Sequence, residues 1–545
     1  MALPRDRSGF NGVVLFPTMT FAIFFAVVLG ISWRLVERPL LWKCFVLGAS
    51  YFFYGWWDPR FCLLLAGSTV ANHLFVQLVA RARTDRSARV AMLTGVVANL
   101  IVLGFFKYYG FFVDSLLAAL EPMGLAPTSL LVKVALPVGI SFFTFCAISY
   151  LVDVYREEQE PIALLDFAVY LSFFPHLVAG PIVRVAEFEP QLRRRRNRNS
   201  VDVTRAARLI CRGMFKKVVI ANYLATAIVD PVFASPGQSP NLQLAVAAVA
   251  YAVQIYADFS GYTDMAIGIA LLMGIRFPDN FDQPYSATSI QDFWRRWHMT
   301  LSRWLRDYVY IPLGGNRGGE RSELRNLVAT MAIGGLWHGA NWTFVVWGFY
   351  HGFGLVAERK WRERTPRSWR RAAIDLRNPG AGTDQRVADG YSDTPAPLRA
   401  SDVGASALRE VPRRVVAADA DTAVIARADL VTRREPNIWL SRLAVFAFVT
   451  VGWVFFRAVD LASAVNFLTG LVTRWGVGEL VTPLVLVVIA AGLIGQFVPR
   501  RLGDAMEFRA SQLPVAVLGV GVGLFLVVCN LLGPVGVAPF IYFDF

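Results

Sequence analysis

Apolar runs of about 20 residues recur along this chain of 545 residues, and they restrict the fold more than any other feature. A helix needs a run of about that length to cross the hydrocarbon core of a bilayer. Charged residues make up 17% of the chain, below the ~25% of an ordinary soluble domain. The runs lie near residues 13–33, 41–57, 61–80, 91–113, 130–152, 164–183, 206–229, 242–275, 326–357, 438–456, 481–498 and 512–533. This pattern predicts a multi-pass membrane protein.

The runs are expected to be helices, because backbone polar groups inside lipid must find their hydrogen-bond partners within the protein. The alternation of lipid-facing and lumen-facing residues that is typical of a membrane barrel is absent. We therefore predict an all-α polytopic membrane protein with about 10–12 transmembrane helices plus re-entrant segments. The first run, near 13–33, is too long for the apolar core of a signal peptide and is predicted to be a retained span.

The net charge of +14 follows the positive-inside rule, because the basic residues cluster in loops between apolar runs, as at 81–89 and 193–198. Nucleic-acid binding is not expected. Segments 164–183 and 326–357 have cytoplasmic-looking charge at both ends. A re-entrant path would explain the first, which Pro175, Gly180 and Pro181 interrupt. The second either turns around near Gly334–Gly339 or forms one long tilted span.

Residues 358–437 are polar and carry no apolar run, which predicts a cytoplasmic and largely disordered insertion. The five cysteines are scattered, with no Cys-x-x-Cys spacing, so neither a disulfide framework nor a metal site is expected.

Polar residues gather between about 254 and 351, in otherwise apolar surroundings. His338 lies in the run Gly-Gly-Leu-Trp-His-Gly-Ala-Asn-Trp, and an ionisable side chain at membrane depth is a functional-site hypothesis by default. Upstream, Trp294, His298 and Ser302 would share one face of a helix at i, i+4 spacing, with Arg295 three residues before His298. The glycine-rich basic loop 311–319 is a weak signal for phosphate binding.

The stretches QDFWRRWHMTLSRWLRDYVYIPLGGNRGG and IGGLWHGANWTFVVWGFYHG resemble those of the membrane-bound O-acyltransferases, in particular the bacterial alginate O-acetyltransferase-like branch. Further similar stretches are LPVGISFFTFCAISYLVDVYR, FFPHLVAGPIVR, YADFSGYTDMAIGIALLMG and the closing FIYFDF. The resemblance covers nearly the whole chain in order, apart from 358–437. Its branch includes acetylators of cellulose, peptidoglycan and other polymers, and a D-alanine transferase for teichoic acid.

The resemblance implies one membrane core made of 1–357 and 438–545, arranged around a central tunnel and interrupted by the insertion 358–437. It also implies a multi-pass protein of the bacterial inner membrane. The resemblance further implies a cytosolic acyl donor, such as acetyl-CoA, and no bound cofactor. It implies that the acyl group passes through the membrane toward hydroxyls of an exported or cell-envelope polysaccharide. The expected partners are a periplasmic or extracellular SGNH-type transferase or a polysaccharide synthase complex.

The resemblance assigns catalysis to His338 and His298. A hydroxyl that attacks a thioester needs a general base, and histidine is the usual one. The candidate substrate-binding and donor-binding residues are Asn341, Trp337, Arg295, Arg296, Arg303 and Arg317, with the arginines expected to meet CoA phosphates.

Three alternatives remain open. One is a polysaccharide transporter or flippase without catalysis, although a transporter usually shows internal repeats and the two halves show no clear one. Another is acylation of a protein or lipid in the same fold. The third is local, because His338 and His298 could be structural histidines. Asp258 and Asp264 are expected to belong to structural polar networks.

Overall fold

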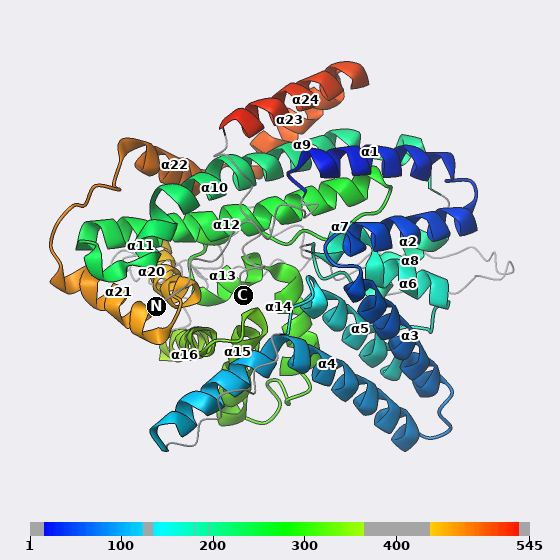
Figure 1. Cartoon of the computed structure of the whole chain (residues 1–545), viewed down its shortest axis with the longest axis horizontal. Helices are drawn as coiled ribbons and strands as arrows, with labels where there is room; N and C mark the ends of the chain where they lie inside the picture. The colour runs from blue at the N-terminus through cyan, green and yellow to red at the C-terminus, as the bar shows by residue number, and fades with distance from the viewer. Residues whose placement is uncertain (1–15, 124–133, 179, 195, 365–436, 533–545) are drawn as a thin grey trace, which may run out of the picture. The chain divides into compact units, whose positions relative to one another are not determined.

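The computed structural model describes residues 16–123, 134–178, 180–194, 196–364 and 437–532. Within these residues the chain is helical, with no strand (Figure 1). Five helices are long and apolar enough to cross a membrane, and five shorter apolar helices have 10–17 residues. The prediction of an all-α polytopic membrane protein is thus confirmed. The predicted disordered insertion at 358–437 falls almost entirely outside the described residues, as does the closing FIYFDF motif.

The first part of the chain contains α1 (Met19–Arg34), α2 (Pro39–Gly55), α3 (Arg60–Ala80), α4 (Asp85–Leu120), α5 (Ile140–Tyr155), α6 (Leu164–Ser172), α7 (Phe174–Leu177), α8 (Val185–Arg193), α9 (Val203–Met214), α10 (Asn222–Leu224), α11 (Asp230–Ala234) and α12 (Asn241–Leu272). The rest contains α13 (Ile290–Arg296), α14 (Met299–Leu305), α15 (Glu320–His338), α16 (Trp342–Arg364), α20 (Ile438–Arg457), α21 (Leu461–Thr473), α22 (Pro483–Ile494), α23 (Arg500–Ser511) and α24 (Val515–Leu532). Three π-helices interrupt this order, η4 (Phe215–Ala221), η5 (Ala225–Val229) and η8 (Arg306–Tyr310).

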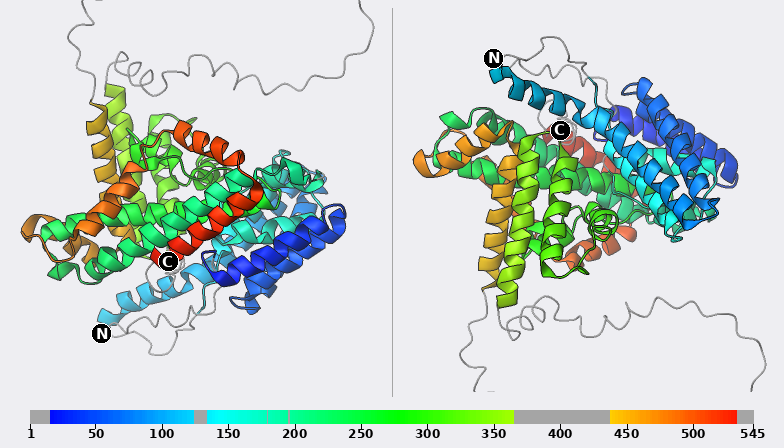
Figure 2. Two further views of the ribbon diagram at one scale, coloured as in Figure 1. Left: turned by 90° about the horizontal axis from the view of Figure 1, so that it is seen from above. Right: turned by 90° about the horizontal axis from the view of Figure 1, so that it is seen from below.

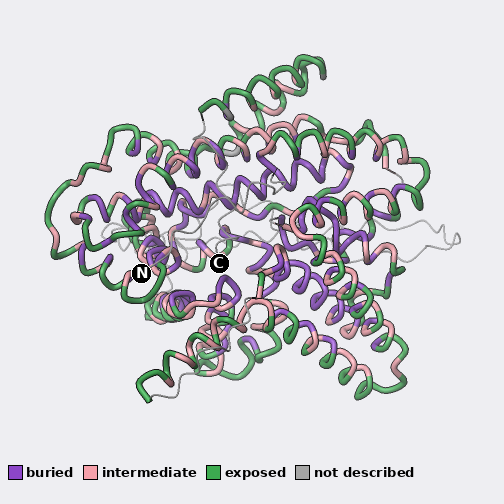
Figure 3. Tube along the Cα trace, in the orientation of Figure 1, coloured by how far each residue is buried: buried purple, intermediate pink, exposed green. Residues whose placement is uncertain are grey.

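The chain divides into two compact units. One joins Met1–Val356 with Arg442–Phe545, and the other is Ala357–Ser441. The core of the larger unit is centred on α12, which is buried over most of its length (Figure 3). Small residues allow α9 to approach it closely, since an added Cβ at Gly268 would lie 2.9 Å from the carbonyl oxygen of Ala206.

Segment 164–183 forms two short helices, α6 and α7, followed by residues without regular structure. Neither helix approaches the ~20 residues of a span. The chain breaks at Phe173, just before Pro175, whose ring prevents an N–H bond back into α6. The interruption expected from Pro175, Gly180 and Pro181 is therefore present.

Segment 326–357 is an antiparallel hairpin, not one long tilted span. Helix α15 ends at His338 and α16 begins at Trp342. The two helices touch through glycines, since an added Cβ at Gly335 would lie 3.0 Å from the Cα of Gly348, and one at Gly352 would lie 3.0 Å from the Cα of Val328. The α15–α16 hairpin therefore brings His338 to its apex.

Helix α20 packs beside α16 (Figure 2). The rings of Tyr350 and Phe448 stack at 4.4 Å, and the Tyr350 hydroxyl donates to the Phe448 carbonyl oxygen at 2.9 Å. The contact brings α20 onto the hairpin, although 358–437 separates α16 from α20 in the sequence. Helix α21 was not predicted, because its 13 residues fall short of a membrane-length run.

Candidate functional site

His338 is the last residue of α15, and its side chain is buried, with 3% of its surface exposed. The helix ends there because Gly339 adopts an extended backbone with φ −166°. A side chain at Gly339 would overlap the ring of Phe344, so only glycine fits this turn. The close packing of Phe344 therefore requires glycine directly after the helix end, and this turn leaves the imidazole at the apex of the hairpin.

Aromatic rings from three helices surround the His338 imidazole. Its ring centroid lies 4.9 Å from Trp337, 5.0 Å from Trp347 of α16 and 4.9 Å from Phe456 of α20, each at a steep interplanar angle. These walls limit the access of water to the ring. A histidine in such a setting can exchange a proton with a bound substrate while competing hydrolysis is suppressed.

The second candidate, His298, does not lie on a continuous helix, so the predicted shared face of Trp294, His298 and Ser302 is wrong. Helix α13 ends at Arg296, and α14 starts at Met299. His298 lies between them in the left-handed region, with φ 42° and ψ 55°. A left-handed conformation at a non-glycine residue costs about 1–3 kcal/mol and is commonly found at functional sites.

Asn280 holds the His298 ring in this break. Its Oδ1 lies 3.2 Å from His298 Nδ1 and accepts from the backbone N–H and the hydroxyl of Thr300, at 3.2 and 2.9 Å. A backbone N–H can only donate, so the Asn280 atom at this point must be the oxygen. The neutral His298 ring must then carry its proton on Nδ1. Its other nitrogen, Nε2, keeps a lone pair, is buried and has no hydrogen-bond partner among the described residues.

Trp337 lies between the two histidines. Its ring centroid is 5.9 Å from that of His298 and 4.9 Å from that of His338. Phe142 and Phe145 of α5 pack against the same ring, at 5.7 and 5.6 Å. The structure therefore joins His298, Trp337 and His338 in one buried cluster, although His298 and His338 are 40 positions apart in the sequence.

The Asn341 side chain shapes the loop after His338. Its Oδ1 accepts from the Thr343 backbone N–H at 3.0 Å, at the start of α16, and its Nδ2 donates to the Val459 carbonyl oxygen at 2.8 Å. Both polar groups of the amide are thus bound to backbone. The structure gives Asn341 the role of a helix cap.

Two of the four candidate arginines are paired with carboxylates. Arg296 donates to Asp292 at 3.0 Å, and Arg303 donates to Glu187 at 2.9 Å. Arg295 and Arg317 are exposed. The loop that carries Arg317 turns on Gly314 and Gly315, whose φ values of 110° and 53° favour glycine.

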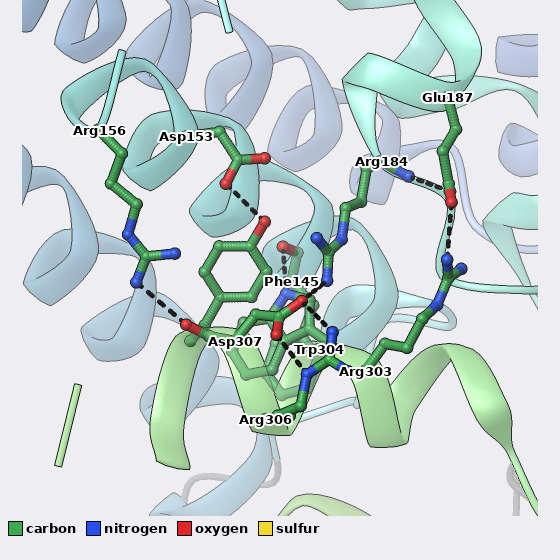
Figure 4. Close-up of polar contacts among 10 residues, drawn as sticks. Phe145, Asp153, Arg156, Arg184, Glu187, Arg303, Trp304, Arg306 and Asp307 are labelled. Carbon is green, nitrogen blue, oxygen red and sulfur yellow. Dashed lines mark hydrogen bonds and ion pairs between the residues drawn. The ribbon is translucent and has the colours of Figure 1, made fainter. Parts of the chain in front are cut away.

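Further charged residues near Arg303 form a network that the sequence reasoning missed (Figure 4). Asp307 binds Arg184, accepts from Arg306 Nε at 2.6 Å, and accepts from Arg156 through its backbone carbonyl oxygen at 3.0 Å. The adjacent Tyr308 donates to Asp153 at 2.6 Å. This network ties η8 to α5 and to the chain before α8. Local sequence could indicate only the adjacent pair Arg306–Asp307, because Arg184, Arg156 and Asp153 lie more than 100 positions before η8.

The charges around Asp307 set its ionisation. Burial raises the pKa of this carboxyl, but the hydrogen bonds and charges of Arg306 and Arg184 outweigh burial, so its pKa lies below the ordinary value. Asp307 is therefore ionised at neutral pH.

Asp258 and Asp264 on α12 form ion pairs with basic side chains on α9 and η4. Asp264 accepts from Arg212 at 2.6 and 2.8 Å and from Lys216 at 2.8 Å, and Asp258 pairs with the buried Lys217. The predicted structural polar networks are thus present. Within the described residues, no group of three or more His, Cys, Asp or Glu side chains is arranged to hold a metal ion.

Comparison with known proteins gives this geometry a context. Residues 99–380 match the model of MBOAT, the membrane-bound O-acyltransferase family. The chain is 46% identical over 340 residues to the probable alginate O-acetylase AlgI of Pseudomonas aeruginosa, covering 62% of this chain and 64% of that one. It is 38% identical over 388 residues to the peptidoglycan O-acetyltransferase of Helicobacter pylori, covering 65% and 72%.

A more distant relative is the teichoic acid D-alanyltransferase of Streptococcus thermophilus, 32% identical over 235 residues, covering 41% of this chain and 57% of that one. The matched region of the family model includes both histidines, Trp337 and Asn280. It also spans more than half of the chain. This protein therefore belongs to the membrane-bound O-acyltransferase family.

Proposed function

We propose that this protein is an O-acyltransferase that moves an acetyl group from a cytosolic thioester, such as acetyl-CoA, toward hydroxyls of an exported or cell-envelope polysaccharide. The observation that carries the proposal is His338, buried at the apex of the hairpin and ringed by aromatic side chains, with Trp337 packed against both His338 and His298. The names of the relatives, alginate O-acetylase and peptidoglycan O-acetyltransferase, favour acetyl transfer to a polymer.

In the proposed reaction, His338 acts as the general base. Its imidazole takes the proton of the attacking hydroxyl as the new C–O bond to the acyl carbonyl carbon forms. The C–S bond of the thioester then breaks, and the proton passes from the imidazole to the leaving thiolate, so that free CoA and the ester are the products. General base catalysis of this kind contributes about 10²–10⁴-fold in rate.

His298 serves the donor side in this proposal. The hydrogen bond to Asn280 leaves Nε2 as its basic nitrogen, and Phe259 packs edge-on against the ring at 4.7 Å. Arg295 and Arg317, both exposed, are the proposed contacts for CoA phosphates, because their guanidinium groups are open to solvent. Arg296 and Arg303 would have to leave Asp292 and Glu187 to take part.

In this route the acyl end of the donor reaches His338 through a tunnel in the membrane core, which we place in the inner membrane of a bacterium, and the attacking hydroxyl comes from the outer side. A periplasmic SGNH-type transferase or a polysaccharide synthase complex is the proposed partner that completes the transfer. A D-alanyl group is the second candidate cargo, because the Streptococcus relative that shares 32% identity is a teichoic acid D-alanyltransferase.

The test compares His338→Ala with wild type at matched expression in the native host. Polymer acylation, with the acyl group identified by mass spectrometry, should fall to background. His73→Ala is the matched control, because His73 lies on α3, away from the cluster, and should leave acylation unchanged. Unchanged acylation in His338→Ala cells would contradict the catalytic assignment.

A second measurement separates an enzyme from a transporter. Membrane vesicles of the native host that contain the wild-type protein and its partners should release CoA from acetyl-CoA when an alginate oligosaccharide is supplied. A transporter without catalysis would release none.

A further inference from the structure

At the end of α15, at the apex of the hairpin, the last backbone carbonyl groups need hydrogen-bond donors from outside the helix. The last four carbonyl groups of a helix have no N–H partner within it. Here these carbonyls belong to residues around His338, and in a buried site an unpaired carbonyl costs free energy comparable to a lost hydrogen bond. The chain turns away at Gly339, so the donors must come from another element.

Two adjacent residues of α4 supply these donors. The Tyr108 hydroxyl donates to the Leu336 carbonyl oxygen at 2.6 Å. The Lys107 amino group donates to the His338 carbonyl oxygen at 3.2 Å and also to the Trp337 carbonyl oxygen. Three consecutive carbonyls at the end of α15 are thus held by one helix that is more than 200 positions away in the sequence.

The same face of α4 makes two more contacts with the apex. Lys107 Nζ lies 5.8 Å from the centroid of the Trp337 ring, and Phe111, one turn later, packs at 5.4 Å against Trp342, the first residue of α16. Helix α4 therefore touches both ends of the turn that carries His338.

Lys107 is a charged residue within an otherwise apolar stretch of α4. Residues Asp85–Met123 form a candidate membrane span, and Lys107 is the single charged residue between Arg89 and Asp114. Charged side chains inside spans are costly and usually serve a function. The carbonyl contacts at the apex account for the presence of this one.

We propose that Lys107 and Tyr108 are positioning residues that fix the backbone of His338, so that its ring meets the acyl group and the hydroxyl in a productive geometry. This inference rests on the proposed function. Neither residue needs to touch substrate. A misplacement of about 1 Å at a reacting group costs about 10²-fold in rate, and a lost carbonyl contact would allow a shift of that kind.

The experiment uses membrane vesicles of the native host that contain the full-length protein together with its partners, with acetyl-CoA as donor and an alginate oligosaccharide as acceptor. Wild-type transfer is measured first, and its absence would defeat the proposed function without bearing on α4. Given an active wild type, Lys107→Met should lower kcat by about 10²-fold while leaving the KM for acetyl-CoA within about twofold. Lys107→Arg retains donors at this point and should recover a large part of kcat.

Tyr108→Phe removes a single donor and should lower kcat by a smaller factor, about tenfold. Tyr109→Phe is the matched control, because it removes a hydroxyl from the next residue of the same helix and should leave kcat unchanged. Thermal unfolding in detergent monitors the fold, and where Lys107→Met does not fold, Lys107→Arg and Tyr108→Phe decide. Wild-type kcat in folded Lys107→Met or Tyr108→Phe, or a parallel fall in Tyr109→Phe, would overturn the proposal.

Discussion

The two histidines of the cluster are held by different means. His338 ends a long helix, and its position follows from backbone: the tight turn at Gly339, the hairpin contact at Gly335 and the carbonyls bound by α4. His298 sits between two short helices with a left-handed backbone, and a side-chain amide, Asn280, fixes its ring. One site depends on helix packing and the other on a local hydrogen bond, so different substitutions should disturb them.

The largest effect is expected from removing the imidazoles themselves. His338→Gln should lower kcat by about 10³-fold, because it removes the proposed base while keeping a side chain of similar size. His298→Gln should have a smaller effect if His298 only assists. Steady-state release of CoA from acetyl-CoA measures both. Equal losses in the two variants would show that the histidines act as one unit, and would contradict separate roles for His338 and His298 in catalysis.

The next largest effect is expected from removing the hydrogen bond between Asn280 and His298. Asn280→Ala removes the acceptor that keeps the proton on Nδ1, so the ring can adopt either tautomer, and kcat should fall by about tenfold. Asn280→Asp keeps an acceptor at this position and should retain more activity than Asn280→Ala. Thermal unfolding of each variant checks the fold. Full activity in folded Asn280→Ala would contradict a role for the Nδ1-protonated tautomer of His298 in catalysis.

The turn after His338 tests the backbone packing that positions this histidine. Gly339→Ala places a methyl group against the Phe344 ring, and overpacking of this kind costs about 1–3 kcal/mol. The expected result is a lower unfolding temperature, together with reduced kcat, because the turn that sets His338 must shift. The double variant with Phe344→Leu makes room for the methyl group and should recover part of the stability. No recovery would indicate that the turn is limited by another contact.

The smallest expected effect concerns Asp307 and pH. Its folded-state pKa lies below the ordinary value of about 3.9, so its stabilising contribution is present above that value and is lost as pH falls through the folded pKa. Asp307→Asn should therefore be less stable than wild type at pH 7, by about 1 kcal/mol or less. The gap should close as the pH falls below about 4. Thermal unfolding across this range measures it, and a gap that widens on acidification would contradict the sign.

The sequence predicted the all-α class and most of the membrane-length helices, because both depend on local pattern, and the catalytic role of His338 stays a prediction. For residues 326–357 the sequence allowed either a turn near 334–339 or one long tilted span. The structure shows the turn, with the two helices in contact at Gly335 and Gly348. The break at His298 was not predictable from spacing, since Trp294, His298 and Ser302 have helical periodicity. At the break, the backbone N–H groups of Met299 and Thr300 donate to Asn280, which lies 18 positions before His298, and not back into α13. Lys107 and Asp307 were missed for the same reason, as their partners are remote in sequence.

The π-helical segment η4 has a consequence for how this chain tolerates changes in length. A π-helix closes its hydrogen bonds at i→i+5, so it holds more residues per turn than an α-helix, and Lys216 and Lys217 both reach α12 from it. Deleting one residue within Phe215–Ala221 would convert the stretch to α-helix, and six α-helical residues turn through about the same angle as the seven π-helical ones. The chain on either side of the stretch would then keep the face that it presents to α12. We expect the loss of a single residue to be tolerated better here than within α9, where it would rotate one side of the deletion relative to the other by about 100°.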